Sequence, residues 1–292
     1  MDNRSALSYC IETNYYSINR NIYWRRMKKA LVILLKIIIF FIGWAIIAGI
    51  IEIPNDNPSV WRFYAELIPL VVMVVFTVVF LKFEKNEVKI PIRENAGKGT
   101  LAGIISGIIW IALSAGIMLG TKQLLIIGET DVSMAWLWIS SAFINVIMQE
   151  LLVHGYIYQL LKTRYNLKLA VVITTAIFTL LHGGAFEAGS VAVINVITMY
   201  LFTTAIYETE NTILAPIMAH TIWNIVGAIF LGCVSLSDDY PSMLLMKPMN
   251  ESVISGGAYM MEGSIIVLAV NTILMFFFLM KYKKKNSKIN SN

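Results

Sequence analysis

The sequence predicts an all-α protein, a polytopic membrane helix bundle of about eight transmembrane helices. Of its 292 residues, 58% are hydrophobic and only 14% are charged, whereas soluble domains carry about 25% charged residues. The mean hydropathy is +0.70. The apolar residues form separate runs of about 20 residues, the length at which a helix crosses a bilayer core of about 30 Å. These properties exclude a soluble domain.

The first three predicted spans lie in the N-terminal part of the chain. A mostly polar tail, residues 1–29, ends in a basic cluster and precedes the first apolar run, residues 30–53. Because no small-residue cleavage pattern follows this run, we interpret it as a retained helix and not as a signal peptide. The second run covers residues 63–83 and is followed by several basic residues. The third covers residues 100–119.

Four further spans are predicted in the centre of the chain. The run over residues 134–161 is apolar apart from a few polar positions, and a short basic turn separates it from the run over residues 169–182. Two glycines follow this fifth span directly. Because glycine is common just after helices, we predict that the helix ends there. Residues 190–207 and 212–231 complete this group.

The last span is predicted over residues 265–280, before a lysine-rich tail at residues 281–292. The longest connection, residues 233–262, contains acidic residues, prolines and glycines around the apolar segment PSMLLMKPM. We expect a loop that rests on the membrane interface, with a lid over a substrate site as the alternative. Since no internal repeat is visible, residues 30–280 are predicted to form one transmembrane domain.

The basic residues predict the orientation of the chain. All but four of the 23 Lys and Arg residues lie in the two tails and in the connections after the second and fourth spans. By the positive-inside rule, both termini are predicted to be cytoplasmic. These residues flank apolar runs and form no patch with aromatic residues between them, so we expect the lipid bilayer and no nucleic acid as a partner. Lys-, Ile- and Asn-rich composition favours a bacterial plasma membrane.

The two cysteines are predicted to lie on opposite sides of the membrane. Cys10 belongs to the N-terminal tail, and Cys233 follows the seventh span. A disulfide bond between them is therefore not expected.

The candidate functional residues are polar side chains inside predicted spans. Glu150 and His154 are four residues apart, so they share one face of a helix. The other two histidines, His182 and His220, also lie in apolar runs, and Asn224 follows His220 by four residues. At 1.5 Å per residue, Glu150, His182 and His220 lie roughly 12 to 20 Å above the cytoplasmic boundary. This agreement in depth predicts one shared polar site.

Three interpretations of this site are open from the residues alone. Intramembrane polar side chains often form hydrogen bonds between helices and have no further role. His154, His182, His220 and Glu150 are also donors that zinc accepts, although no HExxH pair is present. Alternatively, the same side chains activate water without a metal. We also expect Pro216, four residues before His220, to kink the seventh span.

Three segments resemble the motifs of the CAAX-protease and bacteriocin-processing family of intramembrane endopeptidases, which is often called CPBP or ABI. The family pattern is EExxxR, then FxxxH, then HxxxN or HxxxD on later helices. This chain has QELLVH at residues 149–154, FTLLH at 178–182 and HTIWN at 220–224. The motifs occur in the family's order on separate predicted spans, and the resemblance covers about residues 134–231.

The resemblance implies an endopeptidase in which a glutamate and a histidine activate water for attack on a peptide carbonyl. His182 matches the water-activating histidine, and His220 and Asn224 match the residues that stabilise the oxyanion. The implied substrate is a membrane-embedded or membrane-associated peptide or protein. Relatives trim prenylated CAAX proteins, process bacteriocin-type peptides or confer immunity. The resemblance implies no cofactor, with a divalent metal such as zinc as the alternative.

Two positions depart from the family pattern. Gln149 stands where the family has its first glutamate, and His154 stands where it has arginine. A glutamine side chain cannot accept the proton, and Glu150 points about 100° away from Gln149 on a helix. The first hypothesis is an active endopeptidase in which Glu150, helped by His154, is the base. The alternative is a catalytically inactive scaffold or immunity protein that binds a membrane partner through the same cavity. A transport or purely structural role is less consistent with the motifs.

Overall fold

The structure is a computed structural model that describes residues 3–85, 87–234 and 240–290, with side chains described from Tyr23 to Lys288. The chain divides into two compact units, residues 1–46 and 47–292. Most of the helix α1 (Asn3–Gly49) forms the first unit, and its segment Tyr23–Gly49 is apolar. Helix α1 thus begins within the segment predicted as a polar tail, and it ends before residue 53. The second unit contains all the other elements.

The predicted all-α membrane bundle is confirmed. Within the described residues, six helices are long and apolar enough to cross a membrane, and two apolar helices are shorter, so the expected number of eight is approximate. The long helices after α1 are α2 (Pro58–Phe83), α3 (Ala96–Gly120), the continuous run of α4 (Ala135–Glu150), η1 (Leu151–Tyr156) and α5 (Ile157–Arg164), α8 (Ser190–Glu210) and α10 (Ile265–Asn290). The shorter helices are α6 (Leu167–Leu181) and α9 (Leu214–Asn224), which continues as η2 (Ile225–Phe230).

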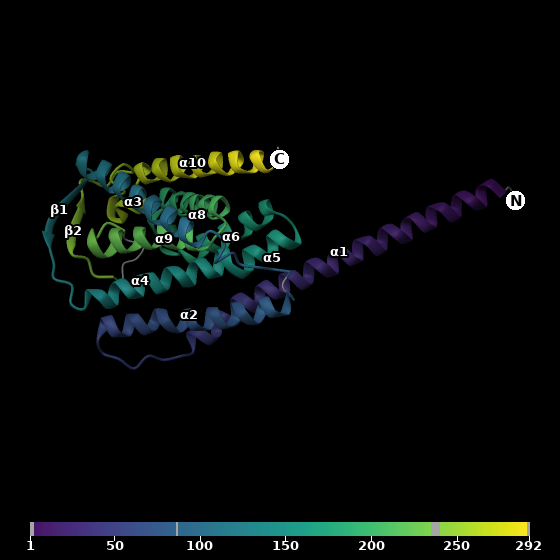
Figure 1. Ribbon diagram of the computed structural model, residues 1–292, viewed down its shortest axis with the longest axis horizontal. Helices are drawn as coiled ribbons and strands as arrows, with labels where there is room; N and C mark the ends of the chain where they lie inside the picture. Colours follow the sequence, from purple (N-terminus) through teal and green to yellow (C-terminus); the bar gives the residue numbers. More distant parts are fainter. Residues whose placement is uncertain (1–2, 86, 235–239, 291–292) are drawn as a thin grey trace. The chain divides into compact units, whose positions relative to one another are not determined.

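Close helix pairs build the second unit, in which α3 packs on α9, α8 packs on α10, and α2 packs on α4 (Figure 1). The pair of α3 and α9 is unusually close. A Cβ atom added to Gly103 would lie 2.3 Å from the backbone oxygen of Ala215, and one added to Gly107 would lie 2.9 Å from that of Ala219. Small residues allow helix backbones to approach in membranes. The close backbone contacts at these two glycines therefore fix the position of α9, the helix that carries His220.

Pro216 does not kink its helix, contrary to our expectation. Helix α9 begins at Leu214, so Pro216 lies in its first turn. The N–H groups of the first turn have no partner within a helix, so proline removes no helical hydrogen bond there. The irregular backbone of this span lies instead at its other end, where residues 225–230 form the π-helix η2.

A two-stranded antiparallel sheet, which the sequence analysis did not predict, lies at one end of the bundle (Figure 1). Strand β1 (Leu124–Glu129) follows α3, and strand β2 (Leu244–Pro248) belongs to the long connection that we expected to be a loop. Short 3₁₀ turns, η4 (Gly257–Tyr259) and η5 (Met261–Gly263), complete this connection before α10. Asp238 and Asp239 of the same connection lie outside the described residues.

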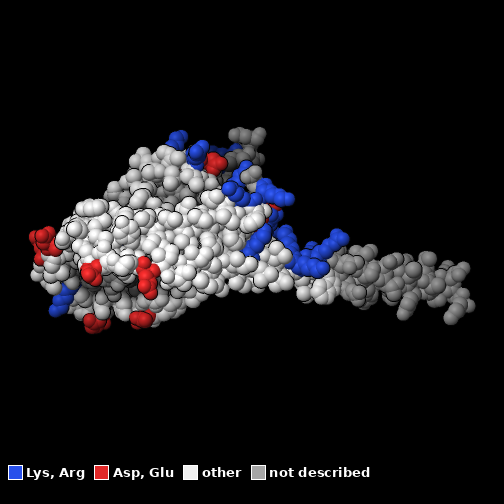
Figure 2. Space-filling view, turned by 90° about the horizontal axis from the view of Figure 1, so that it is seen from below, with Lys and Arg blue, Asp and Glu red and all other residues white. Residues whose placement is uncertain are grey.

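Charged side chains separate along the bundle. Among residues 47–292, on the face seen in Figure 2, Asp and Glu side chains gather mostly at one end of the bundle and Lys and Arg side chains mostly at the other, the basic end. Ion pairs join helix ends at the basic end. The Nζ of Lys162 lies 2.6 Å from Glu208, Arg164 lies 2.7 Å from Glu84, and Lys281 lies 2.6 Å from Glu210. The zone between the two charged ends has few charged side chains, and many large apolar side chains of the helices are exposed. Such a surface is typical of an integral membrane protein.

Cys233 follows η2 and is fully buried, with its Sγ 3.0 Å from the Sδ of Met261, whereas the Cys10 side chain lies outside the described residues. Burial raises the pKa of the Cys233 thiol to about 12. The thiolate is the reactive form, so we expect iodoacetamide to alkylate Cys233 at pH 8 at least about 10³-fold more slowly than a thiol of ordinary pKa near 8.5.

The measurement uses the folded Cys10→Ser variant, with the same protein in denaturant as the control. The rate is expected to rise about tenfold per pH unit while the pH stays below the pKa. Rapid alkylation of the folded protein at pH 8 contradicts the expected burial.

Candidate active site

The helix that carries Glu150 and His154 is irregular at these residues. Helix α4 ends at Glu150, the next six residues form the π-helix η1, and Gly155 leaves the helical region with φ −78° and ψ −120°. Single π-helical turns inside α-helices occur often at functional sites. Within this distorted segment the His154 ring still contacts the carboxylate of Glu150, four residues earlier.

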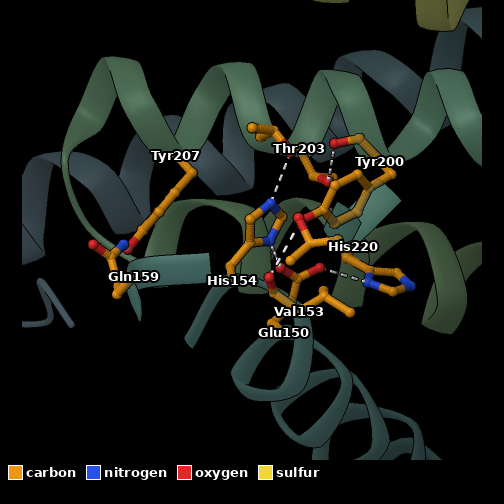
Figure 3. Close-up of polar contacts among 10 residues, drawn as sticks. Glu150, Val153, His154, Gln159, Tyr200, Thr203, Tyr207 and His220 are labelled. Atoms are coloured by element: carbon orange, nitrogen blue, oxygen red, sulfur yellow. Dashed lines mark hydrogen bonds and ion pairs between the residues drawn. The ribbon is translucent and has the colours of Figure 1, made fainter. Parts of the chain in front are cut away.

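Glu150 lies between two histidines (Figure 3). Its Oε2 lies 2.6 Å from the Nδ1 of His154, and its Oε1 lies 3.0 Å from the Nδ1 of His220 on α9. Glu150 and His154 are fully buried, and His220 is only 1% exposed. An ionised carboxylate is an acceptor only, so both histidines donate Nδ1–H to it. The Nε2 atom of each ring is then free to accept a hydrogen bond when the ring is neutral.

His154 is held on its other side as well. Its Nε2 lies 2.8 Å from the Oγ1 of Thr204 on α8, and its ring stacks on that of Tyr200, with centroids 4.7 Å apart and planes 7° apart. Both ring nitrogens of His154 therefore have partners (Figure 3). Such a histidine can anchor the carboxylate, and it has no nitrogen left for a substrate.

A cavity of about 200 Å³ lies beside this cluster. Four of the predicted site residues, Gln149, His182, His220 and Asn224, line it together. Glu150 and His154 are not among its lining residues; they lie behind His220, inside the bundle. The helix period explains why Gln149 lines the cavity and Glu150 does not, because adjacent side chains on a helix point about 100° apart.

His182 ends helix α6 as its C-cap residue. Its Nδ1 lies 2.8 Å from the carbonyl oxygen of Phe178, one turn earlier, and the two rings are in contact with centroids 4.2 Å apart. A carbonyl oxygen only accepts, so Nδ1 carries the proton and Nε2 is the available acceptor. The cavity is thus lined by two histidines, His182 and His220, whose Nδ1 atoms are both occupied.

The sequence analysis missed several residues of the cavity. Arg62 from α2, Asn145 from α4, and Tyr240 from the long connection before α10 also line it. Glu66, one turn after Arg62, is only 6% exposed and lies 2.6 Å from the Nδ2 of Asn145. A signal was present, because an ionisable residue within an apolar span is usually functional. Glu66 lies inside the predicted second span.

The predicted ligand set does not fit a metal ion. Within the described ranges, no group of three His, Cys, Asp or Glu side chains is arranged to hold one. Both carboxylate oxygens of Glu150 accept hydrogen bonds from histidines, and His154 has no free nitrogen. A metal ligand needs a lone pair directed at the ion. His154 has none left, and Glu150 is fully buried and does not line the cavity, so these two residues do not fit a metal bound there.

Comparisons with known proteins support the family that the motifs indicated. The family model described as type II CAAX prenyl endopeptidase Rce1-like matches residues 131–226. This segment contains Gln149, Glu150, His182, His220 and Asn224. None of the curated proteins and none of the solved structures matches the chain. The match confirms the predicted resemblance: residues 131–226 are similar to the Rce1-like family of type II CAAX prenyl endopeptidases.

Proposed function

We propose that this protein is an intramembrane endopeptidase, in which His220, held by Glu150, activates water to hydrolyse a peptide bond of a membrane-associated protein or peptide. One observation carries the proposal. The His220 ring lines a cavity among apolar helices, and its Nδ1 lies 3.0 Å from a buried carboxylate. A histidine that donates Nδ1–H to a carboxylate keeps Nε2 as a base, and the carboxylate stabilises the imidazolium that forms.

The reaction then follows from the residues that line the cavity. The Nε2 of His220 removes a proton from water, and the hydroxide attacks the carbonyl carbon of the substrate. The amide of Asn224, one helical turn from His220, donates a hydrogen bond to the oxyanion, an interaction typically worth about 3 kcal/mol. The C–N bond breaks when the His220 imidazolium returns the proton to the leaving amine. Proton removal by His220 uses one hydrogen of the water, and the other remains available to a further acceptor that lines the cavity.

This proposal revises the roles that the resemblance implied. Glu150 acts through His220 and does not contact the water, because its carboxylate is fully buried and does not line the cavity. His154 holds the Glu150 carboxylate in place from the other side. His220, which the motif alone assigned to the oxyanion, becomes the base. Asn224 keeps the oxyanion role.

The setting of the cavity also suggests its substrate and orientation. Because the lining helices are apolar, we infer that the scissile bond belongs to a segment that lies in or on the bilayer. The basic end of the bundle faces the cytoplasm by the positive-inside rule, which makes both termini cytoplasmic. A bacterial plasma membrane fits the composition.

The function is tested by comparing peptide termini in membranes from cells that make the wild-type protein, the His220→Gln variant or no protein. Glutamine has a similar size to histidine but is not a base. The first two proteins must be present in equal amounts. Fragments that appear only with the wild type are the expected result, and they identify the substrate.

A non-cleaving role has one observation in its favour, namely the glutamine at position 149. If the three samples contain the same fragments, the endopeptidase is excluded under those conditions. The alternative is then a scaffold or immunity protein that binds a partner through the cavity. In that case the wild type and the His220→Gln variant should both co-purify with the same membrane protein.

A further inference from the structure

We propose that Glu66 is a positioning residue that fixes the direction of the Gln149 amide through Asn145. In this arrangement Gln149 presents its carbonyl oxygen, and not its amino group, to the water in the cavity. The inference deepens the proposed function and rests on it for the role of the water. The hydrogen-bond chain itself can be tested without any cleavage.

The chain of contacts crosses from α2 to α4. The Nδ2 of Asn145 lies 2.6 Å from the Oε2 of Glu66, and the Nε2 of Gln149 lies 2.7 Å from the Oδ1 of Asn145. The other oxygen of Glu66 lies 2.8 Å from the Nε of Arg62 and 3.5 Å from the hydroxyl of Tyr240. One helical turn of α2 and one of α4 are therefore linked through side chains beside the cavity.

The direction of this chain follows from the chemistry of its ends. The guanidinium beside Glu66 is a permanent cation, so Glu66 is a carboxylate that can only accept hydrogen bonds. Asn145 must then donate from its amino group to Glu66, which leaves its carbonyl oxygen to accept. Gln149 in turn must donate its amino group to Asn145. Only one orientation of the two amides satisfies all three side chains.

One atom of these hydrogen-bonded side chains, the Oε1 of Gln149, is left without a partner in the described part of the chain. It is buried and has no hydrogen-bond partner among the described residues, although its side chain lines the cavity with His182 and His220. A buried acceptor without a partner is costly, and the group that can satisfy it is a hydrogen of a cavity water or of the substrate. A glutamine can orient an attacking water without accepting its proton, as in some GTPases.

This arrangement explains how a glutamine can replace the usual glutamate of the family. Proton removal belongs to His220 and Glu150, so residue 149 needs only to hold the water. Glu66, from outside the matched residues 131–226, supplies the charge that sets the amide's direction. Glu66 contacts neither substrate nor water and acts only through Asn145.

A merely structural Glu66 would also connect α2 to α4, so the test needs readouts that separate the two roles. The variants are Glu66→Gln, Gln149→Glu and the double variant, each as full-length protein in nanodiscs. The matched control is Glu84→Gln. Glu84 is another buried carboxylate, 2.7 Å from Arg164 and 3.1 Å from the hydroxyl of Tyr156, at the basic end and away from the cavity.

The first readout is the melting temperature, Tm. Glu66→Gln allows the hydrogen bonds from Gln149 through Asn145 to residue 66 to reverse their direction. Gln149→Glu places a carboxylate against the carbonyl oxygen of Asn145, and both groups are acceptors. Each single variant should therefore lower Tm by several degrees. In the double variant the carboxylate is at residue 149 and the amide is at residue 66, so Asn145 can donate to the first and accept from the second. Its Tm should therefore lie clearly above that expected from adding the two single losses. Additive losses would overturn the proposed chain.

The second readout is the cleavage rate of the peptide identified in the comparison of membrane fragments. A misdirected water should lower kcat of Glu66→Gln by about 10- to 100-fold with KM unchanged, and the double variant should recover at least tenfold of this loss. Glu84→Gln should lower Tm but leave kcat unchanged. An unchanged kcat in Glu66→Gln would overturn the positioning role. If the wild type itself cleaves nothing, the proposed function fails, and the Tm measurements alone decide whether the amides are oriented as described.

Discussion

Glu150→Gln is expected to lower kcat at least about 10²-fold and leave KM nearly unchanged. The carboxylate accepts one Nδ1–H from His154 and one from His220, whereas an amide offers one acceptor and one donor group. One histidine must therefore change its tautomer. If His220 changes, its Nε2 carries a proton and the base is lost, which costs about 10⁴-fold in the comparable serine-protease arrangement. If His154 changes, His220 keeps its direction but loses the charge that stabilises its imidazolium.

The measurement is steady-state cleavage by purified protein, with Tm as the check on folding. Glu187→Gln is the matched control, because Glu187 is exposed on the short helix α7 (Gly184–Ala188) outside the cavity lining. It should retain the kcat and Tm of the wild type. A folded Glu150→Gln protein with nearly normal kcat would show that His220 does not depend on this carboxylate.

The sequence was sufficient to predict much of the polar cluster. Glu150 and His154 lie one helical turn apart, and a π-helical turn does not separate them. His220 was expected at a similar depth in the bilayer, and it meets the same carboxylate. The helix period also separated Gln149, in the cavity, from its neighbour Glu150. Each of these predictions depended on local spacing or on span boundaries, which hydropathy defines well.

The residues that sequence analysis missed depend on contacts between distant segments. Glu66 and Arg62 reach the cavity because α2 packs on α4, and Tyr240 comes from the connection before α10. Similarly, β1 and β2 are short apolar segments separated by more than a hundred residues, and neither has a hairpin turn to indicate the pairing. Hydropathy gives the spans but not which faces meet, since lipid-facing and protein-facing residues are both apolar.

Gly103→Ala is expected to destabilise the protein by about 1–3 kcal/mol, the typical cost of overpacking. A Cβ atom at Gly103 would lie 2.3 Å from the carbonyl oxygen of Ala215 and 2.9 Å from the Cβ of Met218. The first of these atoms belongs to the backbone, so α9 itself must move away from α3. His220 lies on α9 only two residues after Met218, and its 3.0 Å contact with Glu150 depends on the position of that helix. We therefore expect kcat to fall together with Tm.

Gly116→Ala in the same helix separates this packing effect from the preference of helices for alanine. A Cβ atom at Gly116 meets nothing within 4 Å, and alanine in a helix interior is favoured over glycine by about 0.5–1 kcal/mol. This variant should therefore keep or raise Tm and keep kcat. Changes in Tm of opposite sign at two glycines of the same helix can arise only from the atoms that surround each glycine. If Gly103→Ala leaves both Tm and kcat unchanged, α3 and α9 are not in backbone contact, and the helix that carries His220 must be held in place by other neighbours.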